Sequence, residues 1–179
     1  MNNGLISKRY AKALLEFATA RGEDKGLYES MRLLSDGIAV TPRLRETLQN
    51  PVVPHSDKLA LLCSAVGDAA GEAYRRFMQL TLENRRESLL QNIALSYLTL
   101  YRRVHRIGRI SVASAAPLSE SLIGRIKYDV ERRIRGTVEL DVRVDPSLGG
   151  GFIFQIEDFR VDASVAGQLE KIRRQLADN

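Results

Sequence analysis

The 179-residue sequence predicts a mainly helical protein with a small α/β part: six short helices, then a small C-terminal strand-helix domain that contains a β-hairpin. Over roughly the first hundred residues, apolar side chains recur every three to four positions, which is the period of an amphipathic helix. From about residue 110 onward, segments in which apolar residues alternate, as they do in half-buried strands, are interspersed with further helical segments. The change of period beside Gly108 predicts a boundary between one domain at 1–106 and a second at 107–179.

Each of the six predicted helices carries one apolar stripe, and the stripes cover residues 10–17, 27–38, 44–48, 59–66, 73–81 and 89–104. Gly22 and Gly108 follow the first and the last stripe, and glycine commonly ends a helix. Pro42 suits the first turn of the third helix, because a proline loses no helical hydrogen bond there. Ser56 is expected to cap the fourth helix, and Val104 is expected to face the core from the sixth.

The second domain is expected to begin with a strand at 110–113 and a helix at 119–134. In the next segment, 138–144, apolar residues alternate with charged ones, which is typical of a strand with one buried face. A turn at 145–147 and three glycines at 149–151 separate it from a second alternating segment at 152–156. These two strands are expected to pair as a hairpin. A short strand at 159–161 and a helix from about residue 165 follow.

The charge of the chain leaves two classes of partner open. The formal net charge is +5 and the isoelectric point about 9.6, values that favour nucleic acid or an acidic protein as partner. The 22 acidic residues, however, are interspersed through most helices, and the densest run of arginines closes a helix, where the helix dipole favours cations. Solvated helix surfaces are therefore favoured, with nucleic-acid binding as the alternative. The basic residues for that alternative are Arg102, Arg103, Arg106, Arg109, Arg132, Arg133 and Arg135.

Three further features bear on the compartment. No run of about 18 apolar residues is present, so no membrane-spanning segment is expected. Met1 leads directly into a helical pattern, without the marks of a signal or transit peptide. Cys63 is the single cysteine and lies on an apolar stripe, so we expect a buried thiol and no internal disulfide. Together these features predict a protein of cytoplasmic type.

The motifs of catalysis and cofactor binding are missing from the sequence. The two histidines, His55 and His105, do not lie in any zinc-binding spacing, and there is no phosphate-binding loop of the G-x-x-x-x-G-K-[ST] type. The glycines at 149–151 precede a strand, whereas dinucleotide-binding folds place such glycines before a helix. We therefore predict no catalytic residue, no metal and no cofactor, with an enzyme of unrecognised type as a second alternative.

Four segments in the same order and spacing resemble one protein family. They are R-Y-A-K-A-L-L-E-F-A at 9–18, L-E-N-R-R-E-S-L-L at 82–90, S-A-A-P-L-S at 114–119, and V-D-P-S-L-G-G-G-F-I followed by D-F-R-V-D-A-S-V at 144–165. The family is the delta subunit of F-type ATP synthases, whose mitochondrial relative is the oligomycin-sensitivity-conferring protein. The chain departs from the family at Gly149, where a bulky aliphatic residue is expected. The resemblance therefore predicts ordinary β dihedral angles at Gly149.

The resemblance implies two binding faces. In the family that the chain resembles, the N-terminal domain is a six-helix bundle. Its first and fifth helices form a groove for the amphipathic N-terminal helix of an alpha subunit of the catalytic head. The residues at those positions are Tyr10, Ala13, Leu14, Phe17, Phe77, Leu80 and Thr81. The C-terminal domain is implied to hold the end of the peripheral-stalk b subunit. The apolar residues for this second face are Phe152, Phe154, Phe159, Val165 and Leu169. For both sets, a purely structural role in the core is the alternative.

The implied function is that of a non-catalytic connector, or stator, which links the catalytic head to the peripheral stalk and resists torque during ATP synthesis and proton transport. The resemblance places such a protein at the cytoplasmic face of the bacterial inner membrane, peripherally and as a monomer within the complex, without nucleic acid. A salt titration separates this function from the nucleic-acid alternative, because phosphate contacts weaken steeply with salt.

Overall fold

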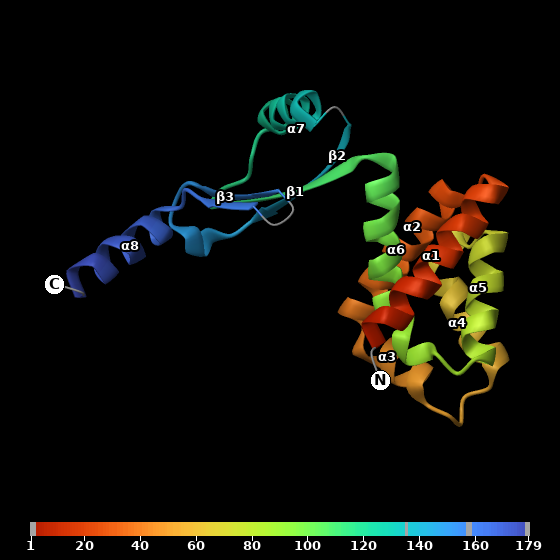
Figure 1. Ribbon diagram of the computed structural model, residues 1–179. Helices are drawn as coiled ribbons and strands as arrows, with labels where there is room; N and C mark the ends of the chain where they lie inside the picture. The colour runs from red at the N-terminus through yellow and green to blue at the C-terminus, as the bar shows by residue number, and fades with distance from the viewer. Residues whose placement is uncertain (1–2, 135, 157–158, 178–179) are drawn as a thin grey trace. The chain divides into compact units, whose positions relative to one another are not determined.

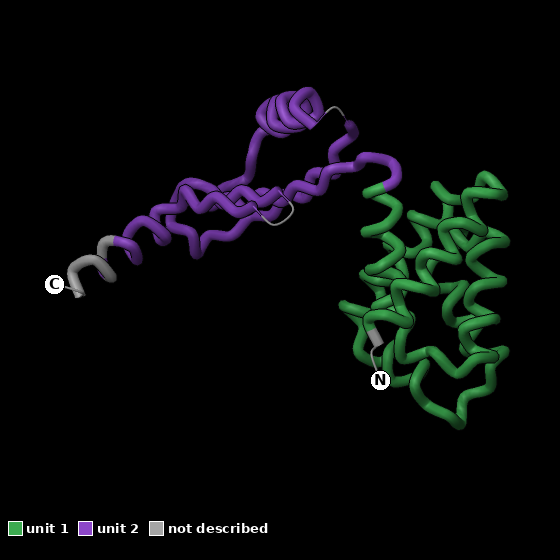
Figure 2. The backbone as a smooth tube through the Cα atoms, in the orientation of Figure 1, with its two compact units in different colours: residues 1–103 green, residues 104–179 purple. Residues whose placement is uncertain are grey.

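The computed structural model describes residues 3–134, 136–156 and 159–177, and it divides the chain into two compact units. The first unit is Met1–Arg103 and the second is Val104–Asn179 (Figure 2). The sequence pattern placed the division slightly later, after residue 106. The four-stranded sheet lies in the second unit, and the described elements outside it are mostly helical (Figure 1). The expected fold class, mainly helical with a small α/β part, is confirmed at this level.

The helices that begin in the first unit are α1 (Asn3–Arg21), α2 (Asp24–Val40), α3 (Pro42–Gln49), α4 (His55–Val66), α5 (Glu72–Glu83) and α6 (Leu90–His105). Helix α2 is central to their packing, because it contacts α1, α3, α4 and α5. Its apolar stripe, including Met31 and Leu34, is fully buried. The hydroxyl of buried Tyr74 donates to the Leu62 carbonyl at 2.9 Å, and that of Tyr97 donates to the Asp24 carbonyl at 3.2 Å, so burial leaves neither group unpaired.

Helix ends follow the predicted signals in part. Gly22 has a φ of +68° directly after α1, as expected for a glycine that ends a helix. Ser56, by contrast, lies inside the first turn of α4, and Pro54 occupies the cap position. Val104 is 63% exposed and does not face the core, because the helical stripe that packs inward ends at Tyr101. Gly108 does not end α6 either, since Arg106 makes that turn with a φ of +54°.

The second unit contains β1 (Ile107–Ser114), α7 (Glu120–Ile134), β2 (Thr137–Val144), β3 (Phe152–Ile156), β4 (Phe159–Asp162) and α8 (Val165–Ala177). The strand order in the sheet is β2-β1-β3-β4. Strand β1 pairs in parallel with β2, while β3 is antiparallel to both β1 and β4. Ile110, Val112 and Val138 form the core of this unit, and Leu118 and Val130 pack against them.

The predicted pairing of 138–144 with 152–156 is wrong. Strands β2 and β3 do not pair, because β1 lies between them. Parallel neighbours need a crossover connection, and α7 supplies it between β1 and β2. The segment after β2 must then cross the end of β1 before β3 can pair on its other side. The hairpin of this unit is instead formed by β3 and β4.

The three glycines belong to this crossing segment. A short 3-10 turn at Pro146–Leu148 precedes them, and Gly149 closes it with a φ of +67° and an N–H donated to the Pro146 carbonyl at 3.1 Å. The expectation of β dihedral angles at Gly149 is therefore wrong, because the residue that ends the turn needs a left-handed conformation. Gly151, with a φ of +74°, lies so close to the Ala163 carbonyl that any side chain would collide with it.

One side chain ties the end of α1 to the start of α5. The N–H of Gly22 donates to the Thr19 carbonyl at 3.1 Å and that of Glu23 to the Ala18 carbonyl at 3.0 Å, which closes α1. Glu23 Oε2 then accepts the backbone N–H of Ala73, in the first turn of α5, at 2.8 Å. Gly71 occupies the cap position of α5 and has no side chain, so Glu23 satisfies an N–H that α5 cannot.

A pair of glycine substitutions tests the geometry of the crossing segment. Gly149→Ala should lower the free energy of unfolding by about 1–2 kcal/mol, because the left-handed conformation is strained for a residue with a Cβ. Gly124→Ala is the matched control: Gly124 lies in α7, has no positive φ, and its Cβ would meet nothing within 4 Å. That change should instead stabilise by about 0.5–1 kcal/mol. Urea denaturation measures both, and equal effects of the two substitutions would contradict the described turn.

The link made by Glu23 predicts a pH dependence. The hydrogen bond from Arg21 and, next, that from the Ala73 amide lower the pKa of the Glu23 carboxyl below its ordinary value of 4.5. A lowered pKa in the folded state contributes stability above the unfolded-state pKa, and this contribution is lost as the pH falls through the folded-state value. Wild type should therefore be more stable than Glu23→Gln at neutral pH, and the difference should shrink below about pH 4.5. A difference that stays constant on acidification would contradict this role.

Candidate functional site: an apolar groove between two helices

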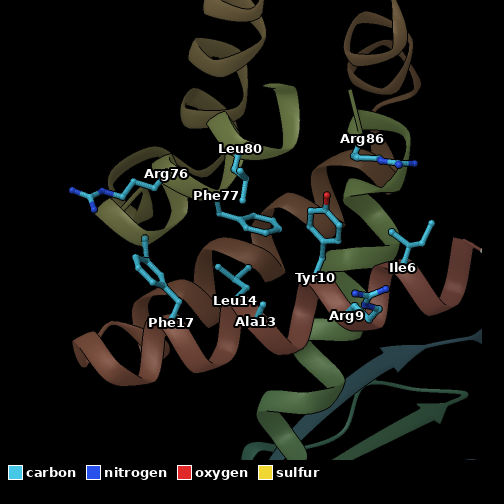
Figure 3. A pocket seen from close by; sticks show the side chains of 11 residues that line it. Ile6, Arg9, Tyr10, Ala13, Leu14, Phe17, Arg76, Phe77, Leu80 and Arg86 are labelled. Carbon is cyan, nitrogen blue, oxygen red and sulfur yellow. The ribbon is translucent and has the colours of Figure 1, made fainter. Parts of the chain in front are cut away.

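Helices α1 and α5 line a groove of about 920 Å³ on the first unit (Figure 3). The two helices contact each other. Because Glu23 joins the C-terminal end of α1 to the N-terminal end of α5, the walls of the groove run in opposite directions. The lining residues are Ile6, Arg9, Tyr10, Ala13, Leu14, Phe17, Ala73, Arg76, Phe77, Leu80 and Arg86.

The groove has a buried floor and an exposed apolar rim. Leu14 and Phe77 are 3% and 7% exposed, so they form the floor and also belong to the core. The Tyr10 ring lies edge-on to the Phe77 ring, with 6.3 Å between the centroids. Leu80 and Phe17 are 48% and 39% exposed, although both are large and apolar. Exposed apolar side chains gathered over a floor of this kind form a surface that a partner can cover.

Six of the seven residues predicted for this groove line it, and Thr81 does not. The Thr81 side chain is fully buried, and its hydroxyl donates to the Phe77 carbonyl at 2.8 Å. The apolar stripe of α5 is wide, and Thr81 lies on the part that packs into the core. The sequence prediction also missed five lining residues, namely Ile6, Arg9, Ala73, Arg76 and Arg86. Helical spacing could have indicated Ile6 and Arg9, which precede Tyr10 and Ala13 by four residues each.

Backbone geometry places Arg86 at the end of the groove. After α5 ends, Arg85 adopts a left-handed conformation with a φ of +53°. Its N–H donates to the Leu82 carbonyl at 3.0 Å, and the N–H of Arg86 donates to the Thr81 carbonyl at 2.9 Å. These two hydrogen bonds form the Schellman motif, which ends a helix and fixes the direction of the following residues. Arg86 therefore leaves α5 from a fixed position.

Of the five residues predicted for the b-subunit face, four are exposed and one packs against the core of the second unit. Phe152, Phe159, Val165 and Leu169 are between 45% and 68% exposed. Phe154 is only half-buried but packs against the core of the second unit. Opposite Phe154 on β4 lies Val161, which the sequence analysis did not single out and which is 41% exposed. Helix α7 contacts β2, so the β3–β4 side of the sheet keeps more of its apolar surface open.

A metal site and a membrane-spanning helix are both absent from the described residues. Within them, no group of three or more histidine, cysteine or acidic side chains could hold a metal ion. In the same part of the chain, no helix has the length and apolar character needed to cross a membrane. What the groove and the open sheet face can do is bind apolar surface of another chain.

The arginines of the nucleic-acid alternative are partly engaged within the protein. The guanidinium of Arg102 lies over the Tyr28 ring, 5.5 Å from its centroid. Arg109 forms a long ion pair of 4.0 Å with Asp141 on the neighbouring strand. Arg135 lies outside the described residues. At least two of the basic residues therefore make contacts within the chain.

Comparison with known proteins points to one family. The model of the family described as ATP synthase delta (OSCP) subunit matches residues 6–176. The chain is 45% identical over 181 residues to an ATP synthase subunit delta of Bacteroides thetaiotaomicron, covering 99% of this chain and 97% of that protein. It is 42% identical over 173 residues to the subunit delta of Phocaeicola vulgatus, covering 96% and 94%.

The fold is also found in a solved structure. A chain in the cryo-EM structure of the Toxoplasma gondii mitochondrial ATP synthase hexamer matches with a TM-score of 0.72 and 19% identity, over 96% of this chain and 97% of that one. At that identity the match concerns the fold alone. The family model and the curated relatives, each over nearly the whole length, show that the chain belongs to the ATP synthase delta (OSCP) subunit family.

Proposed function

We propose that this chain is the connector of a rotary F-type ATP synthase, a stator subunit that joins an alpha subunit of the catalytic head to the b subunit of the peripheral stalk. In this role the six helices of the first unit act as the bundle that holds the head, and the second unit holds the stalk. The chain is non-catalytic and resists the torque of the rotor. It associates with the membrane peripherally, through the complex.

The groove between α1 and α5 is the observation that carries the proposal. Two antiparallel helices with an apolar floor and exposed Phe17 and Leu80 offer the shape and chemistry that an amphipathic helix needs on its apolar face. An extended peptide would leave its backbone N–H and C=O groups unpaired against these side chains. A helix satisfies them internally, so we assign the groove to the N-terminal helix of the alpha subunit.

The open face of the second unit is assigned to the b subunit. Phe159 and Leu169 are 68% and 61% exposed, which is costly for side chains of this size unless a partner covers them. A unit of this size buries a smaller fraction of its surface than a larger domain does, and a permanent partner can supply the rest of the core. Apolar contact with slow dissociation suits a connector under load.

A pair of leucine substitutions tests the groove. Leu80→Asp should weaken binding of a peptide from the N-terminus of the cognate alpha subunit at least about tenfold, because it places a charge in an apolar contact. Leu95→Asp is the matched control, since Leu95 is also 48% exposed but lies on α6 outside the groove. Calorimetric titration of the full chain measures both, and equal weakening by the two substitutions would remove the groove from the binding site.

An aromatic pair tests the second unit. Phe159→Ser should weaken binding of a peptide from the C-terminus of the cognate b subunit by about tenfold, because a large apolar contact is lost. Tyr128→Ser on α7 removes an aromatic ring of similar exposure, 64%, away from the open side of the sheet and should leave the affinity unchanged. Loss of affinity in the tyrosine variant alone would move the b-subunit site to α7.

A further inference from the structure

We propose that the groove selects an amphipathic helix whose carboxylate side chains gather at one end, and that this end docks against Arg9 and Arg86. The inference rests on the proposed function, because it takes the groove to be the docking site of a partner helix. It adds the charge of that helix and the direction in which it lies.

The charges around the groove are unevenly balanced. Its eleven lining residues include three arginines and no carboxylate. Arg76 lies at the end marked by Phe17, and its Nε is 2.6 Å from Glu72 Oε1 (Figure 3). Arg21 also lies near Phe17, and its Nε is 2.9 Å from Glu23 Oε1. The positive charges at this end of the groove are therefore paired within the chain.

The opposite end carries the unbalanced charge. Arg9 and Arg86 lie there with Ile6 and Tyr10 (Figure 3). Neither arginine has a carboxylate partner within the described part of the chain. The first turn of α1 also lacks an acidic residue, and the N-terminal end of a helix carries a partial positive charge of its own. The helix dipole and Arg9 thus add to the same positive potential.

This distribution defines the occupant. The floor between the two ends is apolar, so the partner helix must present an apolar stripe there. At the Phe17 end, carboxylates on its flank would meet only Arg76 and Arg21, which already pair with Glu72 and Glu23. At the other end they would meet two arginines, one of which leaves α5 from a turn fixed by backbone hydrogen bonds. A partner helix that lay in the reverse direction would cover both arginines, remove part of their water and give them no carboxylate in return. Binding in that direction would therefore be weaker.

The two arginines are expected to contribute modestly to the affinity for the partner helix. Ion pairs at the exposed edge of an interface contribute little each, so loss of one arginine should weaken binding about two- to fivefold. Added salt should reduce the same contribution, because mobile ions screen the attraction between solvent-exposed charges. The apolar floor should retain most of the affinity at high salt.

The test uses the full chain and a fluorescent peptide from the N-terminus of the cognate alpha subunit. Two further peptides carry amides in place of carboxylates, in the first or in the second half of the helix. Anisotropy titrations compare wild type, an Arg9→Gln/Arg86→Gln double variant, and an Arg43→Gln control on α3, where the arginine is exposed and remote from the lining set. Leu80→Asp reports separately on the groove.

The expected result is a loss of about four- to twenty-five-fold in the double variant, no loss in the Arg43→Gln control, and a weaker salt dependence in the double variant than in wild type. Only one of the two amide peptides should bind wild type more weakly than the parent peptide does. In the double variant, that amide peptide and the parent peptide should bind with equal affinity. If the peptide binds and Leu80→Asp abolishes binding while the arginine variants behave as wild type, the charge inference is wrong and the groove assignment stands. If wild type binds no peptide, both are overturned.

Discussion

The groove on the first unit depends on one hydrogen bond between distant parts of the sequence. Glu23 follows the last turn of α1, and its carboxylate accepts the N–H of Ala73 at the start of α5. Because the backbone of Glu23 is itself held by its N–H bond to the Ala18 carbonyl, the carboxylate is a fixed anchor for α5. This hydrogen bond holds the two walls of the groove together at the end where α1 finishes and α5 begins.

A second connection restrains the opposite end. Lys58 on α4 is 3% exposed, and its Nζ lies 3.1 Å from Glu87 Oε1 in the turn after α5. A buried ion pair contributes little net stability, but loss of one partner strands a charge and costs about 3–5 kcal/mol. Since Glu87 is the neighbour of Arg86, this pair holds the segment that carries the basic end of the groove. Polar contacts therefore hold α5 at its N-terminal end and hold the segment that follows it, while exposed apolar side chains such as Leu80 remain open to a partner.

The sequence predicted the stripes of these helices well, because periodicity reports which face of a helix is apolar. It could not separate Leu80 from Thr81, since both lie on the α5 stripe and only the neighbouring helices decide which one is covered. Helical spacing could have placed Arg9 on the groove face, since it precedes Ala13 by four residues, but Arg86 follows α5 and lies outside any periodic pattern. The error in the sheet has the same origin: adjacency along the chain suggested that β2 pairs with β3, whereas strand order is set by the crossover through α7. Local patterns predict elements, and long-range packing decides their partners.

In the second unit, glycines allow two segments of the backbone to lie close together, whereas in the first unit polar side chains hold the helices in place. Gly151 allows the loop before β3 to pass against the Ala163 carbonyl, and the Gly150 carbonyl accepts the N–H of Val165 at 3.0 Å. The N–H of Ala163 donates to the Phe152 carbonyl at 2.9 Å, so the start of α8 is held beside the start of β3. Phe152 and Val165, both about half exposed, are thereby brought to one region. A side chain at Gly151 would force these segments apart, and the exposed apolar residues that we assign to the stalk would no longer form a continuous face.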